Sequence, residues 1–468
     1  MFSTVQYENW LWGLSLIVYT PIFLLTTGLL INASNISIRL KLIISAILST
    51  IATFSFANGI SLWLLLLPFN TLFDSDENME KKTVPYFSVV VYFLFFFLII
   101  GLYFKGYRRP SHHPSLMAVF SNPTDAVCYF FIWAGASFTP LDLSAGNPSY
   151  YIGYIAAFTG GFIFILFISV AVYNLLKANS RQLTCFYPWF VIGIFSVTSG
   201  FALTVGRSGF GIAQALSSRY VASSIFLSIS ALVSVYLTYV FHFRNKGDVA
   251  GRIFKIVQAT VLFLMLILHI YTYILYIPAM EKLQWFAKNG KLGLQFSELV
   301  YDETRLKTLW HDPKDLLSKF SDLVQYGLLD FKPVSPGLLT WVKKNREGNM
   351  SHGFFGECSL VSENELYVSG WAYQPKKTIP ADNVIITYTK EGCEPRPVGI
   401  TMPWKKRPGV EQLFKSRSML NCGFSEIIDI SGLPAGKLTI SAWTVDVTAN
   451  TVYKLRNNFQ LTIAEEQK

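Results

Sequence analysis

The chain has 468 residues, 52% of them hydrophobic, and a formal charge of +10 at pH 7. Its mean hydropathy of +0.39 is far above that of an ordinary soluble enzyme, so chain length is a poor guide to the number of domains. The positive residues lie mainly in short segments between long apolar stretches, where cytoplasmic topology requires them. The charge therefore does not indicate a nucleic-acid partner, and the composition predicts a membrane protein with a soluble C-terminal part.

Eight apolar stretches in the first 280 residues are candidate membrane-spanning helices. A hydrocarbon core about 30 Å thick requires about 20 apolar residues per helix. The fourth candidate is the weakest, because Asp125 and Asp142 bracket a short apolar run, Ala126–Phe138. In chain order the candidates are Trp10–Asn32, Leu42–Leu67, Tyr86–Phe104, Thr124–Leu143, Tyr150–Leu176, Tyr187–Val205, Val221–Phe243 and Lys255–Ile277.

Lys and Arg are concentrated in the connections that follow the odd-numbered stretches. Cytoplasmic connections carry the excess of Lys and Arg, so both termini are expected outside the cytoplasm. If the fourth stretch only dips into the membrane, everything after it inverts. The connections after the odd-numbered stretches hold Arg39, Lys41, Lys105, Arg108, Arg109, Lys177, Arg181, Arg244, Lys246, Arg252 and Lys255, and the others hold Lys81, Lys82, Arg207 and Arg219.

The first stretch has no basic segment before it and no clear small-residue cleavage site, so it is expected to be retained and not removed as a signal peptide. Three of the five cysteines, Cys358, Cys393 and Cys422, lie in the C-terminal part. In an exported domain they allow one disulfide and leave one cysteine over. Three free thiols fit a cytoplasmic domain equally well.

Residues 279–350 are predicted to form an amphipathic helical connector between a transmembrane domain, 1–278, and a β domain, 351–468. Leucine and phenylalanine recur near helical spacing from Leu299 to Leu323, with charged residues between them. Asp312-Pro313 should break the connector into at least two helices. The predicted strands of a small antiparallel β-sandwich are Glu365–Ala372, Asn383–Thr389, Arg396–Thr401, Gly423–Asp429 and Leu438–Trp443, with Val452–Arg456 and Phe459–Ile463 as further candidates.

The polar segment Gly206–Tyr220, between two apolar stretches, is the best candidate for a binding site. Arg207 and Arg219 offer guanidinium groups for bidentate contacts with a phosphate or carboxylate, next to the aromatic ring of Tyr220. Gly209 and Gly211 allow backbone N–H groups to approach an anion. The alternative is that the two arginines anchor helix ends at the lipid interface.

Other polar groups are weaker candidates. His112 and His113 are adjacent, but no further ligands accompany them at metal-site spacing, so a rigid loop is expected and no metal. Carboxylates near residue 77 could activate an acceptor hydroxyl or be solvated; they are Asp74, Asp76, Glu77 and Glu80. His242 and His269 lie near hydrocarbon, where either function or a bond to a neighbouring helix is expected. The sequence has no phosphate-binding loop, dinucleotide fingerprint, nucleophile elbow or paired-cysteine metal motif, so no cofactor is predicted.

Three segments resemble a broad family of bacterial polytopic membrane proteins, most of them of unknown activity. They are Phe56–Trp63 (FANGISLW), Lys105–Ser115 (KGYRRPSHHPS) and Gly206–Tyr220 (GRSGFGIAQALSSRY). The resemblance covers most of the first 280 residues and implies the topology class. It implies no activity.

The C-terminal part is similar to small β modules that accompany bacterial surface-glycan glycosyltransferases. The matching residues are Val368–Pro375 (VSGWAYQP), Pro380–Val384 (PADNV), Cys422–Phe424 and Leu433–Gly436. This likeness implies an association with envelope carbohydrate only by analogy. A basic cluster that could meet acidic glycan or lipid headgroups consists of Lys405, Lys406, Arg407, Lys415 and Arg417.

Together these features predict a multi-pass protein of the bacterial inner membrane with an extracytoplasmic C-terminal domain. The leading hypothesis is that it binds or acts on envelope glycan, or its lipid-linked precursor, at the outer face, with glycosyltransferase-like chemistry as the form that the action would take. Its partners would be membrane lipid, a polyprenyl-phosphate-linked or acidic glycan, and other envelope-assembly proteins. The alternative is a non-catalytic scaffold or receptor whose β domain binds glycan or protein. A transporter is disfavoured, because charge within the spans is scarce and no inverted repeat is evident.

Overall fold

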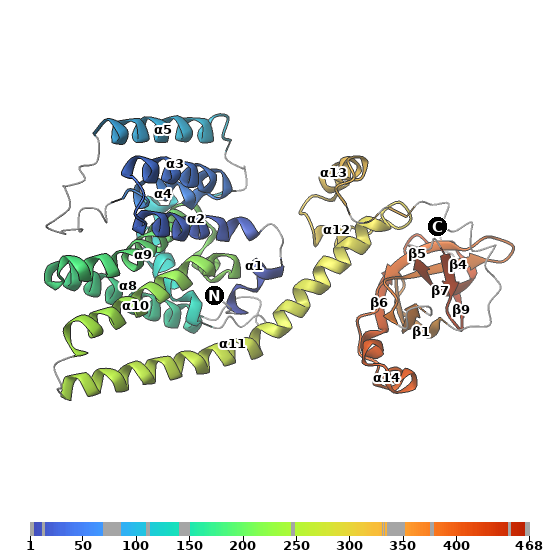
Figure 1. Cartoon of the computed structure of the whole chain (residues 1–468). Helices are drawn as coiled ribbons and strands as arrows, with labels where there is room; N and C mark the ends of the chain where they lie inside the picture. Colours follow the sequence, from blue (N-terminus) through green and yellow to red (C-terminus); the bar gives the residue numbers. More distant parts are fainter. Residues whose placement is uncertain are drawn as a thin grey trace. The chain divides into compact units, whose positions relative to one another are not determined.

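The computed structural model describes residues 4–11, 15–68, 86–108, 113–139, 150–244, 249–329, 331, 333–334, 352–374, 379–447 and 451–463. The chain forms two compact units, Met1–Glu281 and Lys282–Lys468. The first, here called the helical unit, is built from helices that lie roughly side by side, and the second, the C-terminal unit, carries all the strands (Figure 1). The predicted order of a helical region followed by antiparallel β-structure is confirmed.

The helical unit contains long apolar helices joined by short 3₁₀ segments. Local sequence sets several of their ends: Ser37 caps α3 by accepting a hydrogen bond from Leu40 N–H, and Asn179 and Gln182 form a capping box at the start of α9. The elements are η1 (Thr4–Gln6), α1 (Tyr7–Leu11), α2 (Leu16–Ala33), α3 (Ile38–Ser55), η3 (Ala57–Ser61), α4 (Leu62–Leu65), α5 (Tyr86–Phe104), α6 (Ala118–Ser121), α7 (Pro123–Gly135), η5 (Ala136–Phe138), α8 (Tyr150–Lys177), α9 (Ser180–Arg207), η7 (Ser208–Phe210), η8 (Ile212–Leu216), η9 (Ser218–Tyr220), α10 (Val221–His242) and α11 (Val249–Gln295).

Six of the described helices are long and apolar enough to cross a bilayer: α3, α5, α8, α9, α10 and α11. The apolar helix α2 is shorter, and its 18 residues extend about 27 Å. Large apolar side chains such as Phe87, Phe97 and Phe158 are more than 60% exposed on these helices. Such exposure is expected where lipid, and not water, surrounds the helix.

The second predicted span, Leu42–Leu67, is not one helix. Helix α3 ends at Ser55, and the chain then turns back along the bundle as η3 and α4. Asn58 is hydrogen-bonded to Ser199 near the end of α9, whereas Leu67 O accepts a hydrogen bond from Tyr187 near its start. The segment therefore runs antiparallel to α9. The apolar run continues through the turn at Phe56, so hydropathy alone cannot reveal the break.

The fourth predicted span, Thr124–Leu143, is also wrong as a crossing helix. Helix α7 has 13 residues, about 20 Å of helix. Pro114, before α7, lies against Gly209, just after the end of α9. The start of α8 lies at this same end of the bundle, because the far end of α8 contacts the far end of α10 through Asn174 and Thr238. The residues before α7 and the start of α8 therefore lie at the same end of the bundle, so α7 does not carry the chain to the opposite end.

Small residues allow α7 to pack deeply inside the bundle. A side chain at Gly135 or Gly160 would collide with the backbone of the facing helix, and one at Gly200 would collide with the Trp133 ring. Trp133 itself is fully buried and donates a hydrogen bond to Tyr220 O at 3.1 Å. The small residues of α8 and α9 thus serve close helix packing, as their sequence suggests.

The last apolar helix is longer than predicted, because α11 continues through Pro278 to Gln295. At its start Phe254 stacks on Tyr239 of α10, and further along Tyr276 contacts Tyr7. The predicted break at Asp312-Pro313 is confirmed: Asp312 is extended and caps α13, and Pro313 is its first residue. The connector helices after α11 are α12 (Glu303–Lys307) and α13 (Pro313–Gln325).

The strands of the C-terminal unit form two antiparallel sheets. One has the order β1-β2-β3 with β6 also on β2, and the other has the order β5-β4-β7-β8 with β9 also on β7. Two short helical elements, α14 (Pro408–Phe414) and η12 (Arg417–Asn421), precede β6. The strands are β1 (Gly353–Ser362), β2 (Glu365–Gln374), β3 (Ile379–Pro380), β4 (Val384–Lys390), β5 (Arg396–Thr401), β6 (Gly423–Asp429), β7 (Gly436–Asp446), β8 (Thr451–Lys454) and β9 (Phe459–Ile463).

Side chains from both sheets share one hydrophobic core that includes Val368, Phe424, Ile386 and Ile440. The connector packs on this unit through a second cluster, in which Leu292 and Phe296 meet residues of β4, β5 and β7. Of the predicted apolar face, only Leu299 joins this cluster. Leu306, Leu316, Leu317 and Phe320 pack together with Leu294 in a separate cluster, and Leu309 and Leu323 are exposed.

All five cysteines are described and free. Burial raises the pKa of Cys358 and of Cys422 to about 11, so both are neutral thiols at physiological pH.

Candidate functional site

The three segments that stand out in the sequence meet at one cavity of the helical unit. Its volume is about 340 Å³. Phe56–Trp63 contributes Asn58, the Lys105–Ser115 segment contributes His113, and Gly206–Tyr220 contributes Arg207 and Arg219. The cavity lies at the end of the bundle where α9 ends, here called the Arg207 end. The opposite end, where α9 begins, is called the Arg181 end.

Two glycines shape the loop between α9 and α10. Gly211 has φ +100° and ψ 155°, a conformation that is nearly restricted to glycine. Gly209 lies so close to Pro114 that an added Cβ would be 2.5 Å from the proline Cβ. The Gly211 N–H donates to Ser208 O at 2.9 Å, so it does not face an anion as its sequence suggests. These glycines hold the loop against the segment that carries His113.

Arg207 is the last residue of α9 and faces a histidine and a phenylalanine ring. Its Nη1 lies 3.4 Å from His113 Nε2, and its guanidinium carbon lies 5.6 Å from the centre of the Phe210 ring. The His113 ring packs edge-on against the same phenylalanine. No carboxylate pairs with Arg207 among the described residues, so its charge is available for a bound anion.

Arg219 is held by a carboxylate that lies 211 residues earlier in the chain. Glu8 Oε2 accepts a hydrogen bond from the Arg219 N–H at 3.1 Å and lies 3.6 Å from Nε. Asn9 donates to the carbonyls of Ser218 and Arg219, and Ser218 Oγ accepts from Glu8 N–H. The short helix α1 thereby fastens the loop in place.

Tyr7 of α1 completes this contact. Burial raises the pKa of its hydroxyl, and the Glu8 carboxylate raises this pKa further, whereas Arg219 lowers it. The Tyr7 hydroxyl is therefore neutral at physiological pH and contributes packing without adding charge beside the two arginines.

Asn58 and Ser199 form the polar part of the cavity wall away from the arginines. Asn58 Nδ2 donates to Ser199 Oγ at 3.0 Å. The remaining lining is largely apolar and comes from α2, α9 and α10, with Val18, Ile22, Phe195, Leu203, Ala222 and Phe226. A cavity with two cations near one end and apolar walls suits an amphiphile whose anionic group meets the arginines.

Sequence reasoning missed Glu8 and Asn58. Glu8 stands in a short polar segment that looks like an ordinary terminus, and its partner is 211 residues away. Asn58 belongs to a segment that the resemblance singled out, but the apolar run around it was interpreted as an unbroken span. A lone asparagine inside an apolar run was the one available signal.

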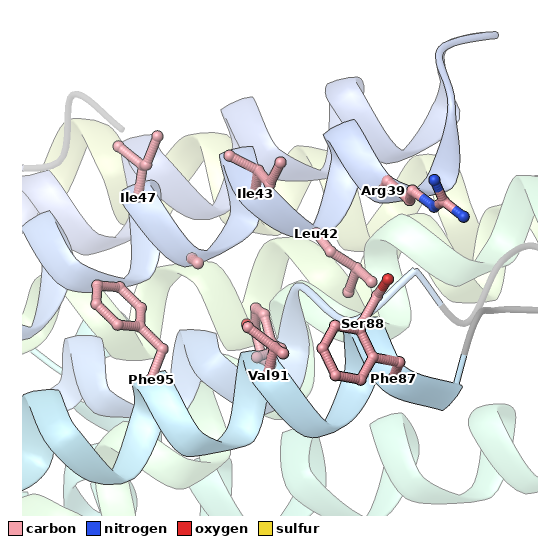
Figure 2. Close-up of a pocket in the computed structure, with 10 residues that line it drawn as sticks. Arg39, Leu42, Ile43, Ile47, Phe87, Ser88, Val91 and Phe95 are labelled. Carbon is pink, nitrogen blue, oxygen red and sulfur yellow. The ribbon is translucent and has the colours of Figure 1, made fainter.

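A second hollow in the helical unit is an apolar groove of about 370 Å³ between α3 and α5. Figure 2 shows Leu42 of α3 pointing toward α5, where Val91 and Phe95 line the groove, with Arg39 at one end. Because its walls are almost wholly apolar, the groove suits hydrocarbon chains and offers no group for chemistry.

The other predicted site residues do not join the cavity. Asp74, Asp76, Glu77, Glu80 and His112 lie outside the described residues. His242 packs against Tyr173, and His269 packs against Tyr273 on its own helix. Within the ranges that the structure describes, no group of three or more His, Cys, Asp and Glu side chains could hold a metal ion.

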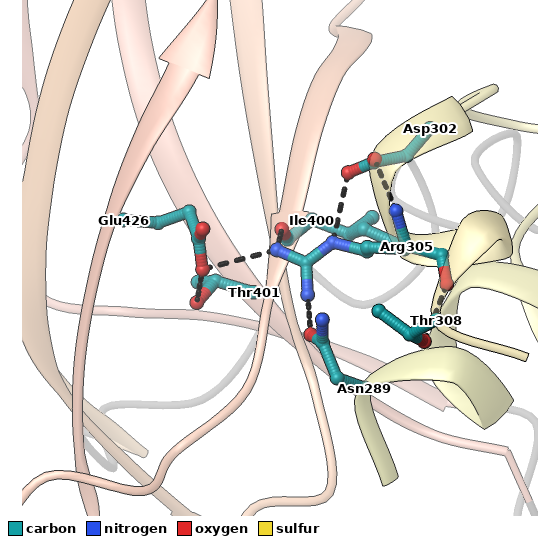
Figure 3. Close-up of polar contacts among 7 residues, drawn as sticks. All are labelled: Asn289, Asp302, Arg305, Thr308, Ile400, Thr401 and Glu426. Carbon is teal, nitrogen blue, oxygen red and sulfur yellow. Dashed lines mark hydrogen bonds and ion pairs between the residues drawn. The ribbon is translucent and has the colours of Figure 1, made fainter. Parts of the chain in front are cut away.

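A buried arginine in the C-terminal unit has a structural role. Arg305 donates to Asp302, Asn289, Ile400 O and Glu426, which joins the connector helices to the sheet (Figure 3). Its side chain is 5% exposed. With these contacts made, the guanidinium has little capacity left for a ligand.

The outer surface of the C-terminal unit carries a row of partly exposed rings, here called the aromatic row. Trp371 and Tyr373 alternate with buried residues along β2, and their ring centres are 6.0 Å apart. Phe414 of α14 packs on Tyr373, and His352 and Tyr453 extend the row. The exposed members of the basic cluster, such as Lys405 and Lys415, lie in the segments that flank α14.

Comparisons with known proteins found no relative of this chain. No protein-family model matches the chain, and neither the curated proteins nor the solved structures contain a detectable match. The two resemblances drawn from sequence motifs therefore stay predictions, and the geometry carries the functional argument.

Proposed function

We propose that this protein binds the phosphate of a lipid-linked glycan, or of its lipid-linked precursor, in the cavity at the Arg207 end. The convergence of Arg207 and Arg219 on one largely apolar cavity supports this function. Guanidinium groups form bidentate, charge-assisted hydrogen bonds with phosphate. The apolar walls from α2, α9 and α10 then accommodate the hydrocarbon next to that phosphate.

The distribution of positive charge supports an outer-face location for the cavity. Among the described residues of the helical unit, Met1–Glu281, four Lys and Arg side chains belong to the Arg207 end and seven to the Arg181 end. By the positive-inside rule this excess favours a cytoplasmic Arg181 end. The four are Lys105, Arg108, Arg207 and Arg219, and the seven are Arg39, Lys41, Lys177, Arg181, Arg244, Arg252 and Lys255.

The C-terminal unit follows the same end of the bundle in this proposal. Helix α11 starts beside the end of α10 and contacts Tyr7 further along. Glu281, the last residue of the helical unit, therefore follows the Arg207 end. This supports an extracytoplasmic C-terminal domain in a bacterial inner membrane. Transfer of the glycan to an acceptor stays a prediction. The candidate acids Asp74–Glu80 lie outside the described residues, and the described residues before and after them, Leu67 and Phe87, lie at the Arg181 end, so these acids do not support a base at the outer face.

The test compares anionic lipid retained by the purified wild-type chain with that retained by Arg207→Ala, Arg219→Ala and Arg219→Lys. Losing a charge-assisted bond typically costs about 1.5–3 kcal/mol, which is about tenfold to a hundredfold in affinity. Arg219→Lys should also weaken binding, because a point charge cannot replace a bidentate fork. Retention is measured by native mass spectrometry at matched expression.

Arg181→Ala is the matched control, because Arg181 is an exposed arginine at the opposite end of α9. It should retain lipid as the wild type does. Wild-type retention by all three cavity variants would contradict the proposed function and leave both arginines as interfacial anchors.

The aromatic row favours one alternative function, a membrane-anchored receptor whose C-terminal unit binds acidic glycan. Aromatic faces pack against sugar C–H groups through their negative quadrupole, and nearby cations attract acidic groups. Trp371→Ala in the full chain should then reduce retention on an immobilised acidic polysaccharide, while Tyr326→Ala, at a 73% exposed ring elsewhere in the unit, should not. Equal retention by both variants would remove this alternative.

A further inference from the structure

The apolar groove between α3 and α5 opens to the outside of the helical unit. Two of its lining residues, Leu42 and Tyr92, are buried, whereas Ile43, Ile47 and Phe95 are at least 40% exposed. Both helices are long and apolar enough to cross a bilayer. Inside a membrane the groove therefore faces hydrocarbon, and a lipid chain can fill it.

One charged side chain lines the groove, and it lies at one end. Arg39, in the first turn of α3, is exposed and lies at the same end as Ser88 of α5 (Figure 2). The Tyr92 hydroxyl is already used, because it donates to Trp63 O at 2.8 Å. No carboxylate pairs with Arg39 among the described residues. Its guanidinium group is therefore available for an anion at the mouth of an apolar groove.

The direction of the two helices adds to this attraction. Near their other ends Phe54 of α3 contacts Tyr103 of α5, so α3 and α5 run the same way and both begin at the end that carries Arg39. Helix N-termini carry partial positive charge. An anion next to Arg39 thus meets a guanidinium group and the positive ends of two helices.

The length of the groove corresponds to one leaflet of a bilayer. Arg39 and Ile47 are eight residues apart on α3, about 12 Å along the helix axis. One leaflet contributes about 15 Å, half of the hydrocarbon core. The groove therefore runs from the interface at the Arg181 end through most of the adjacent leaflet, as an acyl chain does.

We propose that this groove binds one anionic phospholipid from the leaflet at the Arg181 end. An acyl chain lies along α3 and α5, the headgroup phosphate meets Arg39, and the Ser88 hydroxyl donates to it. An apolar helix of a second copy would match the walls but would leave the Arg39 charge without a counterion. The site is at the opposite end of the bundle from the Arg207 cavity and does not depend on the proposed function.

The experiment places the purified full chain in nanodiscs that contain a trace of phosphatidylglycerol with a photoactivatable diazirine in one acyl chain. Mass spectrometry then maps the adducts. Adducts on α11 report lipid that contacts any apolar surface, since Leu262 is 54% and Phe263 is 61% exposed there. The ratio of groove to α11 adducts should fall about fivefold when a phosphatidylcholine matrix is replaced by phosphatidylglycerol with the same acyl chains, the value of one cation beside an anionic lipid.

Arg39→Gln removes the charge, so the adduct ratio should no longer depend on the matrix. Arg181→Gln is the matched control, because Arg181 is an exposed arginine at the same end that does not line the groove, and the dependence should persist. Val91→Trp fills the groove from a 46% exposed position. It should remove the adducts from α3 in both matrices and leave those on α11. In lipid-free detergent all three variants should melt as the wild type does.

Three results would overturn the proposal. Equal adduct ratios for the wild type in the two matrices would mean that the groove holds only unselected lipid. A matrix dependence that survives Arg39→Gln would remove Arg39 from the site. Adducts on α11 without any in the groove would mean that another occupant, such as a second copy of the chain, covers it. None of these results bears on the Arg207 cavity, whose adducts would map to α2, α9 and α10.

Discussion

Arg207 and Arg219 have different surroundings, and the difference determines which of them meets an anion first. Arg207 faces a histidine and a phenylalanine ring, whereas Arg219 is paired with Glu8. The Arg219 side chain is 45% exposed, so this pair is screened and contributes little to stability. If the cavity binds phosphate as proposed, Glu8 would compete with it for Arg219.

Glu8→Gln tests this competition. The amide oxygen can still accept the Arg219 N–H, so the loop stays fastened, but the negative charge disappears. An exposed ion pair is worth at most about 1 kcal/mol, so affinity for an anionic lipid should rise by no more than about fivefold. The measurement is the amount of anionic lipid that the purified variant retains relative to the wild type, by native mass spectrometry. Weaker binding by the variant would show instead that the Glu8 charge is needed to position Arg219.

Gly211 is the residue on which the shape of the loop most depends. Its φ of +100° and ψ of 155° exclude other residues at a cost of about 1–3 kcal/mol. Gly211→Ala should therefore lower the thermal unfolding temperature and weaken lipid retention together. Gly206→Ala is the control, because no atom lies within 4 Å of its added Cβ and alanine favours the helix. Equal unfolding temperatures for the two variants would contradict the role given to Gly211.

At the scale of elements, the Arg305 contacts bind the connector to the sheet. Arg305→Ala removes the partner of Asp302 and Glu426 and leaves Ile400 O without its donor. Both carboxylates are about one-third exposed and can rehydrate in part, so the expected cost is about 2–4 kcal/mol. Protease resistance of the C-terminal unit in the full chain, followed against temperature, measures the effect.

Lys307→Ala provides the comparison, since Lys307 pairs with Glu303 and both side chains are 55% exposed. A surface change of this kind should stay within about 0.5 kcal/mol. Arg305 matters to the connector only if its variant unfolds at a clearly lower temperature than this one.

Sequence patterns predicted some elements well for identifiable reasons. The predicted strands Arg396–Thr401 and Gly423–Asp429 coincide with β5 and β6 because turn residues bound them closely. Asp312-Pro313 marked the start of α13 because both residues suit a helix N-terminus. The turn at Phe56 escaped detection, since one asparagine, Asn58, is too short a polar interruption of the apolar run to mark a break.

The candidate site was predictable in part. The polar loop revealed Arg207 and Arg219, because guanidinium groups between two apolar stretches are conspicuous. Their contacts with Glu8, and the position of Asn58 beside them, depend on chain segments brought together by folding. Sequence spacing does not report such distances, so neither residue could be placed at the cavity beforehand.

At the scale of the whole molecule, two differences from the predicted topology compensate. The stretch predicted as the second span runs to the Arg207 end as α3 and returns toward Tyr187 at the Arg181 end. The stretch predicted as the fourth span starts at the Arg207 end and does not carry the chain to the opposite end. In the proposed topology one crossing is added and one is lost, so helix α1 and the end of the helical unit remain on the same side. The segments around Lys105 and Arg108 move to the Arg207 end as a consequence.

Cysteine labelling tests this topology. In a cysteine-free background, Ser121→Cys precedes α7 and Ala178→Cys lies between α8 and α9. If α7 does not cross, only α8 separates these two positions, and they lie on opposite sides of the membrane. A membrane-impermeant maleimide added to intact spheroplasts should label Ser121→Cys and should reach Ala178→Cys only after permeabilisation.

Val361→Cys, at an exposed position of β1, adds the C-terminal unit to the same experiment. It should be labelled together with Ser121→Cys, because α11 leaves the helical unit at the Arg207 end. Labelling of Ser121→Cys and Ala178→Cys from the same side would mean that α7 crosses the membrane after all. Labelling of Ala178→Cys alone would place the Arg207 end, and the cavity with it, in the cytoplasm, where the proposed outer-face substrate could not reach the two arginines.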